Sequence, residues 1–469
     1  MLPFPSSSRA LRGLLSSLVA IAILLPGTGI AHNAASTVAI PGLVPAMLAP
    51  GFWIERLDAP DAPLLDPVAI EQQNAVMRRD DRSIHAPLAV ADTIARATVA
   101  DWIGTLSTRP TQPRFDADGP IDAATLDRWM DARALDTLPT RVTPQFGLVV
   151  HRADLRAFPT ATRVFSRPGD TDIDRFQEDA LFPGAPVAVL HASRDGEWLF
   201  VVGERYRAWI ARRHVALGSR DAVAGYAARA ANGLVVTGAT VRTVFTPDEP
   251  AVSDLQLDMG VRLPRAPWNP MHALHGQVPA AGHVVELPIR DDAGMLAFAP
   301  ALIPASADVA GAALPHTRAA VLRQAFKFLG ERYGWGHSYQ ARDCSGFVSE
   351  VYRSFGILLP RNTSAQATTS ALDRIALTPD MTHAQRLALL RQTDVGDMLF
   401  MPGHVMLIIG HLDGEPWVIH DTAGMGVRGA DGTVAHLALN GVVITPLTPM
   451  LSGDAQDTIG RLTSIQRMR

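Results

Sequence analysis

The chain contains a single cysteine, Cys344, so no disulfide bond can form within it. Its fold must therefore rest on buried apolar cores rather than on covalent crosslinks. The 469 residues are 47% hydrophobic and 19% charged, which is typical of globular domains and argues against a disordered, collagen-like or coiled-coil chain. Because domains usually contain about 100–200 residues, this length predicts two to four of them.

The first 31 residues have the pattern of a secretory signal peptide. Arg9 and Arg12 precede an apolar run over residues 14–25, and Gly29 and Ala31 form a small-x-small cleavage pattern. That run is shorter than the roughly 20 residues needed to span a bilayer. We therefore expect export, cleavage, and a mature protein that is periplasmic or secreted and has no stable membrane insertion.

The charge and the motifs argue against several classes of partner. The formal net charge is −4 at pH 7, which gives no general attraction to nucleic acid or to an anionic membrane. One cysteine and 15 scattered histidines show no closed zinc-ligand spacing, and the glycines form no phosphate-binding loop. We therefore expect no nucleic acid partner, no metal and no cofactor.

The hydrophobic pattern divides the mature chain into successive regions. Residues 32–145 carry helical apolar spacing, clearest over Asp66–Met77 and Ala91–Leu106, and are expected to form an N-terminal helical region that wraps the rest. From there the pattern changes to short strands separated by Pro-Gly and Asp-Gly turns, which is typical of small β-barrels. We expect one barrel over residues 146–218 and a second over 219–298.

A proline-rich stretch over residues 299–315 is expected to be a linker. The last domain then covers residues 316–469 and begins with a predicted helix over Thr317–Gly330. The segment after this helix contains the only cysteine and carries the chemistry.

Cys344 begins a predicted amphipathic helix. Phe347, Val351 and Phe355 recur at i, i+4 and i+8, and Asp343 suits the N-cap position. A helix N-terminus carries partial positive charge and free N–H donors, which favour a thiolate and can hold an oxyanion. The pattern therefore predicts a nucleophilic cysteine with a place for the negative charge that it generates.

His404 and His420 are the predicted partners of the nucleophile. Residues 396–410 have the pattern of two strands joined at Pro402-Gly403, with His404 at the start of the second. A turn at Asp413-Gly414 leads into a third strand that contains His420. If both rings face the helix, His404 can accept the thiol proton and His420 can fix the tautomer of His404.

These residues also have plainer interpretations. A single cysteine is often a small core residue, and a histidine at a strand start is often a satisfied polar group. In an exported chain, a cysteine between Asp343 and Ser345 at a helix start favours the reactive interpretation.

Five sequence blocks stand in order over about residues 315–469. They are Tyr333-x-Trp335-Gly336, Asp343-Cys344-Ser345-Gly346, Leu359-Pro-Arg361-Asn-Thr363-Ser-Ala-Gln366, Gly403-His404-Val405 and His420-Asp421. Together they resemble the NlpC/p60 family of cell-wall cysteine peptidases. One departure is His337, where a second glycine commonly follows the Trp-Gly pair. The upstream region is similar to the subgroup that carries an N-terminal stabilising domain and two bacterial SH3-like domains.

The resemblance implies an α+β fold, with a papain-like catalytic domain preceded by two small SH3-like β-barrels and an N-terminal helical region. It implies hydrolysis of peptidoglycan stem peptides, usually between γ-D-glutamate and the diamino acid. Peptidoglycan-derived peptides are then the expected partner, with Cys344, His404 and His420 as catalytic residues.

The resemblance also implies substrate contacts. In relatives the residues that flank the cysteine hold the free amine of an N-terminal L-Ala, and Asp343 and Ser345 occupy those positions here. Tyr333, Trp335 and Thr363 match residues that line the site. The first SH3-like domain of such relatives narrows the groove, so that free-ended muropeptides enter. Glu178 and Tyr206 are candidates for its contacts with the substrate.

Two other functions remain open from the sequence. One is a wall-binding protein in which the SH3-like modules act and the peptidase domain is inactive. The other is an acyltransferase on the same fold, which passes the thioester to an amine or a lipid rather than to water.

Overall fold

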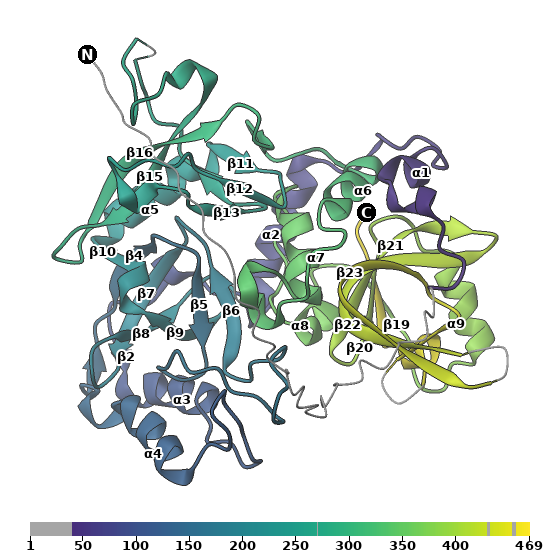
Figure 1. The fold of residues 1–469 in the computed structure, drawn as a ribbon, viewed down its shortest axis with the longest axis horizontal. Helices are drawn as coiled ribbons and strands as arrows, with labels where there is room; N and C mark the ends of the chain where they lie inside the picture. The colour runs from purple at the N-terminus through teal and green to yellow at the C-terminus, as the bar shows by residue number, and fades with distance from the viewer. Residues whose placement is uncertain (1–39, 270, 429–431, 453–455) are drawn as a thin grey trace, which may run out of the picture. The chain divides into compact units, whose positions relative to one another are not determined.

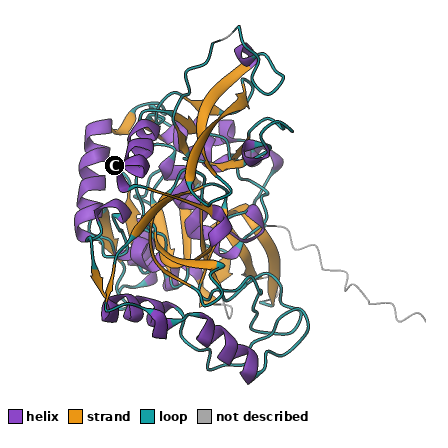
Figure 2. Cartoon of the chain, turned by 90° about the vertical axis from the view of Figure 1, so that its left-hand side faces the viewer, coloured by secondary structure: helices purple, strands orange, loops and turns teal. Residues whose placement is uncertain are grey.

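The computed structural model describes residues 40–269, 271–428, 432–452 and 456–469. The predicted signal peptide, residues 1–31, lies outside the described residues. Helices and strands are both present throughout the described chain (Figure 2), so the expected mixed fold is confirmed. Within the described ranges, none of the helices has both the length and the apolar character needed to cross a bilayer.

Residues 145–218 form a seven-stranded antiparallel sheet (Figure 1). Because successive side chains of a strand point to opposite faces, one strand can serve two cores. In β8, Leu199 and Val201 join one apolar cluster, while Phe200 and Val202 join a second cluster that α3 (Arg96–Leu106) covers. The strands are β4 (Gln145–Val149), β5 (Ala153–Arg156), β6 (Gln177–Leu181), β7 (Pro186–Ala192), β8 (Trp198–Val202), β9 (Arg207–Ala211) and β10 (Val215–Gly218), in the order β10-β4-β7-β8-β9-β5-β6.

A second group of strands follows α5 (Arg220–Ala231). They pair as three small sheets, β14-β11-β17, β12-β13 and β15-β16, around one shared apolar cluster. Their bounds are β11 (Leu234–Val236), β12 (Thr240–Arg242), β13 (Gln256–Asp258), β14 (Arg262–Leu263), β15 (Gly282–Arg290), β16 (Leu296–Pro304) and β17 (Val309–Ala310).

The stretch over residues 299–315 differs from the expected linker. β16 continues to Pro304 and pairs with β15 along its whole length, and β17 follows at once. Proline is tolerated in β16 because this strand pairs on one side only, so its outward edge needs no N–H donor. The proline pattern that suggested a linker is here the pattern of an edge strand.

The N-terminal helices divide between two cores. Trp53 of α1 (Pro50–Ile54) and Met77 of α2 (Pro67–Asp80) belong to the apolar cluster of the last domain. By contrast, α3 packs against the seven-stranded sheet, and α4 (Ala123–Ala132) packs against the segment that joins β5 to β6. Each of these helices is short and buries its apolar side against a neighbour, so residues 40–145 wrap two domains instead of forming a separate core.

The last domain is an antiparallel sheet with helices on both faces (Figure 1). In β21, Val405 and Leu407 face the cluster of α6 and α7, while Met406 and Ile408 face the cluster of α9. The helices are α6 (Arg318–Phe326), α7 (Cys344–Arg353), α8 (Thr363–Thr368), α9 (His383–Leu390) and α10 (Thr458–Arg461). The strands are β19 (Asp373–Ala376), β20 (Met398–Met401), β21 (His404–Leu412), β22 (Glu415–Arg428), β23 (Val434–Pro446), β24 (Met450–Ser452), β25 (Gln456–Asp457) and β26 (Ser464–Arg467), in the order β19-β26-β20-β21-β22-β24-β25 with β23 also paired to β22.

Candidate active site

Cys344 is the first residue of α7, as the sequence pattern predicts. Asp343 is the N-cap, and its side chain accepts a hydrogen bond from the Gly346 N–H at 2.8 Å. A Cβ added to Gly346 would lie 2.8 Å from the His337 ring, so the first turn of α7 needs a glycine there. The buried face of α7 anchors this turn in the core, and the helix thereby fixes the position of the thiol.

The thiol faces the turn that joins β20 to β21. The Cys344 Sγ lies 3.9 Å from the Gly403 carbonyl oxygen and within reach of the Val405 N–H. His404 lies between these two residues, at the start of β21. The structure therefore brings the predicted nucleophile to the turn that carries the predicted base.

His404 and His420 contact each other through their rings. The His404 Nε2 and the His420 Nδ1 are 2.8 Å apart, and the His420 Nε2 lies 3.1 Å from the Thr445 hydroxyl. His420 is fully buried, whereas His404 is partly exposed. Because Nε2 of His404 is engaged by His420, Nδ1 is the ring nitrogen that remains for the thiol proton.

Burial favours the neutral forms of both Cys344 and His404. It raises the pKa of the Cys344 thiol to about 12, and the Asp343 carboxylate adds to the rise. It also lowers the pKa of His404 to about 4. Burial and the Asp343 carboxylate thus act against the thiolate that the helix N-terminus is expected to favour.

The Asp343 carboxylate is engaged by the protein itself. Arg361 donates to both of its oxygens, at 3.1 and 2.7 Å, and the Gly336 N–H donates at 3.0 Å. Burial would raise the pKa of Asp343, but the charge of Arg361 outweighs it and holds that pKa below its ordinary value. Asp343 alone therefore offers no free charge to a substrate ammonium, contrary to the simple expectation.

Arg361 is nevertheless shared between two carboxylates. It pairs with Asp343 and also with Asp179 of β6, and all three side chains are buried. Around this three-residue cluster, the charge of the buried Arg205 also acts on Asp179 and on Arg361, so two carboxylates and two guanidinium groups balance in this part of the site. Ser345 belongs to the same cluster, since its hydroxyl donates to Asp343 at 3.2 Å and accepts from Arg361 at 2.9 Å.

His337 connects the last domain to the seven-stranded sheet. Its Nε2 lies 3.0 Å from Glu350 of α7, and its Nδ1 lies 3.0 Å from Asp179. Glu350 also pairs with Arg342 at 2.9 Å, and Arg342 pairs with Asp258 of β13. His337, at a position where the family commonly has glycine, thus links three parts of the chain through buried contacts.

The other expected substrate residues take different positions. Tyr333 is buried beside Cys344, and burial together with the charge of Cys344 raises its pKa. The Trp335 Nε1 donates to the Gln177 carbonyl oxygen of β6 at 3.0 Å, which ties the loop to the first barrel. Thr363 is the half-buried first residue of α8, and the structure shows no contact that assigns it a role.

Glu178 and Tyr206 form a pair on the seven-stranded sheet. The Tyr206 hydroxyl donates to the Glu178 carboxylate, and burial raises the pKa of Glu178. The charge of Arg361 acts on both groups, and Asn362 contacts the Tyr206 hydroxyl. These two candidates therefore lie near the Arg361 cluster.

Asp421 follows His420 on β22 and has an unusual environment. Neither carboxyl oxygen has a hydrogen-bond partner within the ranges that the structure describes. Burial, with the nearby charges of Asp343 and Glu331, raises the pKa of Asp421 to about 9. This carboxyl is therefore neutral at neutral pH and adds no charge beside His420.

The contacts of three residues at the site could not be predicted from the sequence. Thr445 contacts His420 only because β23 pairs with β22 in one register. The roles of Arg361 and His337 depend on Asp179, which is more than 150 residues away in sequence. His337 carried a signal as a departure from the family pattern, but Thr445 carried none. Among the described residues, no group of three or more His, Cys, Asp or Glu side chains is arranged to hold a metal ion.

A buried cysteine at a helix start, next to a histidine pair on an antiparallel sheet, is typical of cysteine hydrolases. Comparison with known families agrees with this class: residues 330–439 match the NlpC/P60 family, and residues 163–211 match an SH3 domain of the SH3b1 type. The chain carries an NlpC/P60 catalytic domain, from a family of peptidoglycan hydrolases that comprises cysteine peptidases, preceded by an SH3b domain.

One solved structure shows the same fold over most of the chain. An NlpC/P60 endopeptidase from Photobacterium damselae subsp. piscicida superimposes with a TM-score of 0.70 over 88% of this chain and 96% of that chain, at 16% identity. An NlpC/P60 family protein from Bacillus cereus gives a TM-score of 0.47 over 69% of this chain and 99% of that chain, at 19% identity. No curated protein sequence matches the chain.

Proposed function

We propose that this protein is a cysteine peptidase that cleaves the bond between γ-D-glutamate and the diamino acid in muropeptides with a free N-terminal L-Ala. The observation that carries the proposal is the position of the Cys344 thiol against the turn of His404, whose ring contacts His420. The family assignment supports peptidoglycan as the substrate.

In the proposed reaction, the Cys344 sulfur attacks the amide carbonyl carbon while its proton passes to Nδ1 of His404. The Gly346 N–H is taken by the Asp343 side chain, so the N–H groups of Cys344 and Ser345 are those of the first turn of α7 that can hold the resulting oxyanion. His404 then gives the proton to the leaving amine, the C–N bond breaks, and a thioester remains on Cys344.

The second half of the reaction uses water. His404 accepts a proton from a water molecule, and the oxygen attacks the thioester carbonyl. The C–S bond breaks, the thiol regains its proton, and the γ-carboxyl group of D-glutamate is released. His420 positions the ring of His404 throughout, and the Thr445 hydroxyl in turn holds His420.

The preference for a free amine rests on two groups of residues. The Arg361 cluster contains two buried carboxylates, Asp343 and Asp179, and Glu178 adds a third acidic group from the SH3b domain. Contacts between the SH3b domain and the catalytic domain also support a substrate groove that the SH3b domain narrows. The Gln177 side chain donates to the Gly336 carbonyl oxygen at 2.8 Å, and Arg332 pairs with Asp172 at 2.5 Å.

Export to the periplasm or the medium is part of the proposal, because peptidoglycan lies outside the cytoplasmic membrane. Its support is the signal-peptide pattern of residues 1–31.

Product analysis tests the proposed function. The protein is incubated with L-Ala-γ-D-Glu-diamino acid tripeptides that carry either diaminopimelate or lysine, and the products are read by mass spectrometry. We expect two fragments, the free dipeptide L-Ala-γ-D-Glu and the free diamino acid. A dipeptide attached to an added amine would instead indicate acyl transfer, and an unchanged substrate would indicate a binding protein.

A further inference from the structure

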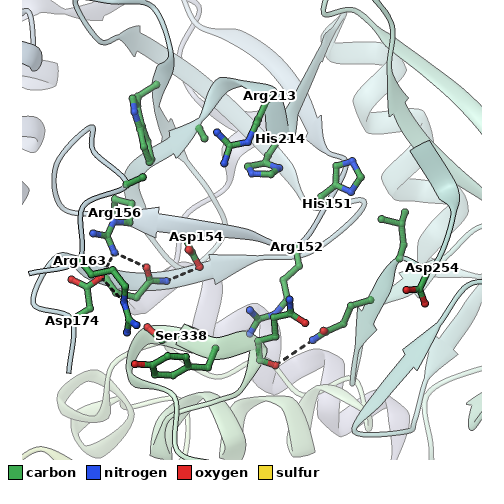
Figure 3. A pocket seen from close by; sticks show the side chains of 18 of the residues that line it. His151, Arg152, Asp154, Arg156, Arg163, Asp174, Arg213, His214, Asp254 and Ser338 are labelled. Carbon is green, nitrogen blue, oxygen red and sulfur yellow. Dashed lines mark hydrogen bonds and ion pairs between the residues drawn. The ribbon is translucent and has the colours of Figure 1, made fainter. Parts of the chain in front are cut away.

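A cavity of about 510 Å³ lies outside the cysteine–histidine site. Figure 3 shows its walls, to which the SH3b domain contributes His151 and Arg213, the second group of strands contributes Asp254, and the loop before α7 contributes Ser338. Cys344 is not among its lining residues. Its volume lies in the range of small-molecule sites, which are about 300–1,000 Å³.

The cavity has more positive than negative side chains. Five arginines and three aspartates line it, and one of the arginines, Arg152, also pairs with Asp258 at 3.4 Å, so one positive charge is in excess. Two of the aspartates are already paired, because Asp174 contacts Arg156 at 2.5 Å and Asp254 contacts Arg242 at 3.2 Å. The third aspartate, Asp154, accepts a hydrogen bond from Gln177.

One arginine of the cavity is free to bind. Arg213 is exposed and has no hydrogen-bond or ion-pair partner in the part of the chain that the structure describes. Arg163 is more engaged, because it donates to the Thr171 carbonyl oxygen at 3.3 Å and reaches Asp174 at 3.7 Å, beside the closer Arg156. In Figure 3, Arg213 and Arg163 lie on different sides of the cavity.

Two imidazoles beside Arg213 add neutral donors. The rings of His151 and His214 have centroids 6.0 Å apart, and the buried Nδ1 of His214 has no hydrogen-bond partner within the described ranges. Burial and the charge of Arg213 lower the pKa of His214 to about 4, so this ring is neutral at neutral pH. It can donate a hydrogen bond to a ligand without needing a counter-ion.

The loop that forms one wall is held in an uncommon conformation. Tyr339 and Gln340 both have φ near +60°, which is rare for residues other than glycine. Arg152 holds this loop, since it donates to the carbonyl oxygens of His337 at 3.0 Å and Ala341 at 2.8 Å. Such backbone conformations persist where surrounding contacts fix them, and they cluster at ligand sites.

We propose that this cavity binds an oxyanion, a carboxylate or phosphate group, at a site separate from the peptidase centre. The guanidinium fork of arginine matches both groups in geometry and charge. Arg213 supplies the free fork, and His214 and Arg163 supply further donors around the cavity. The inference does not depend on the proposed peptidase reaction.

Calorimetric titration of the intact protein tests the site with two probes, inorganic phosphate and acetate. Chloride keeps the ionic strength constant, so that general screening does not contribute. We expect saturable binding of at least one probe. Stronger binding of phosphate would indicate a phosphate-bearing ligand, and stronger binding of acetate a carboxylate-bearing one.

The Arg213→Gln variant should bind the preferred probe about tenfold more weakly, because a hydrogen bond to a charged group is lost. Arg391→Gln is the matched control, since Arg391 is also exposed and lies outside the cavity lining. It should bind as the wild type does. The proposal is overturned if neither probe binds saturably, or if Arg213→Gln and Arg391→Gln bind equally well.

Discussion

At the scale of single residues, the site depends on two groups that burial holds neutral. A thiol with a pKa of about 12 and an imidazole with a pKa of about 4 do not exchange a proton in the resting site. Proton transfer from Cys344 to His404 must then accompany attack on the substrate. This differs from a site with a preformed thiolate–imidazolium pair, and the difference can be measured.

The pH profile of kcat/KM should show a broad plateau. The reactive form needs neutral His404, so activity should fall only as the pH drops toward about 4, and thiol ionisation should not limit it until far above pH 9. Initial rates between pH 4 and 10 measure this. An acid limb with a midpoint between pH 6 and 7 would contradict the neutral pair.

His404 should act as the general base and His420 as a positioning residue. His404→Ala should lower kcat by about 10²–10⁴, the usual contribution of general base catalysis. His420→Ala should also lower kcat, with KM little changed, because His420 acts on His404 and not on the substrate. The assignment fails if His404→Ala retains the wild-type kcat, or if His420→Ala changes only KM.

At the scale of elements, the first turn of α7 should be sensitive to a single added methyl group. Gly346→Ala should lower the free energy of unfolding by about 1–3 kcal/mol, because the new Cβ would lie 2.8 Å from the His337 ring. Gly225 in α5 is the matched control, since a Cβ there meets its nearest neighbour at 3.7 Å.

Denaturant unfolding of both variants measures the effect. Gly225→Ala should be neutral or stabilising by up to about 1 kcal/mol, as alanine favours a helix over glycine. Equal stability changes in the two variants would show that the contact of Gly346 with His337 is not tight.

The elements that the sequence predicted best are those with a local signal. The apolar repeat of α7 and the Pro402-Gly403 turn define the position of Cys344 and His404 without any knowledge of distant contacts. β16 was mistaken for a linker, because proline marks both a linker and an edge strand, and only its pairing with β15 distinguishes them. Thr445 could not be predicted, since it depends on the register of two long strands.

At the scale of the whole molecule, buried ion pairs join the catalytic domain to the strands before it. Glu350 is one of these groups: burial would raise its pKa, but Arg342 and His337 hold it at about 2. A carboxylate with a lowered pKa stabilises the fold above its unfolded pKa of about 4.3, and this stability is lost as the pH falls toward 2. The long-range partners of this network are invisible to any local sequence pattern.

The free energy of unfolding should therefore decrease between about pH 5 and pH 2. In Glu350→Gln, the unfolding free energy should change less steeply with pH over this range. The difference in slope should be up to about 1.4 kcal/mol per pH unit, which corresponds to about one bound proton. Urea unfolding at several pH values measures both slopes. Identical slopes in the wild type and in Glu350→Gln would show that protonation of Glu350 does not cause the pH dependence of stability.

Substrate selection also belongs to the whole molecule, because the acidic groups come from two domains. Acetylation of the L-Ala amine should lower kcat/KM by about 30-fold or more, the cost of removing one partner of a close charge pair. Glu178→Gln should narrow the gap between free and blocked peptides, while it keeps an acceptor for the Tyr206 hydroxyl. Equal cleavage of both peptides by the wild type would instead describe a general wall endopeptidase.

The central claim is that Cys344 is the nucleophile of a peptidase, and one measurement tests it most directly. The hydrolysis rate of L-Ala-γ-D-Glu-diamino acid peptides is compared for the wild type and Cys344→Ala, with circular dichroism to show that both are folded. The account predicts a loss of several orders of magnitude, because no other residue can form the thioester. A folded Cys344→Ala protein that keeps even about a tenth of the wild-type rate would contradict it.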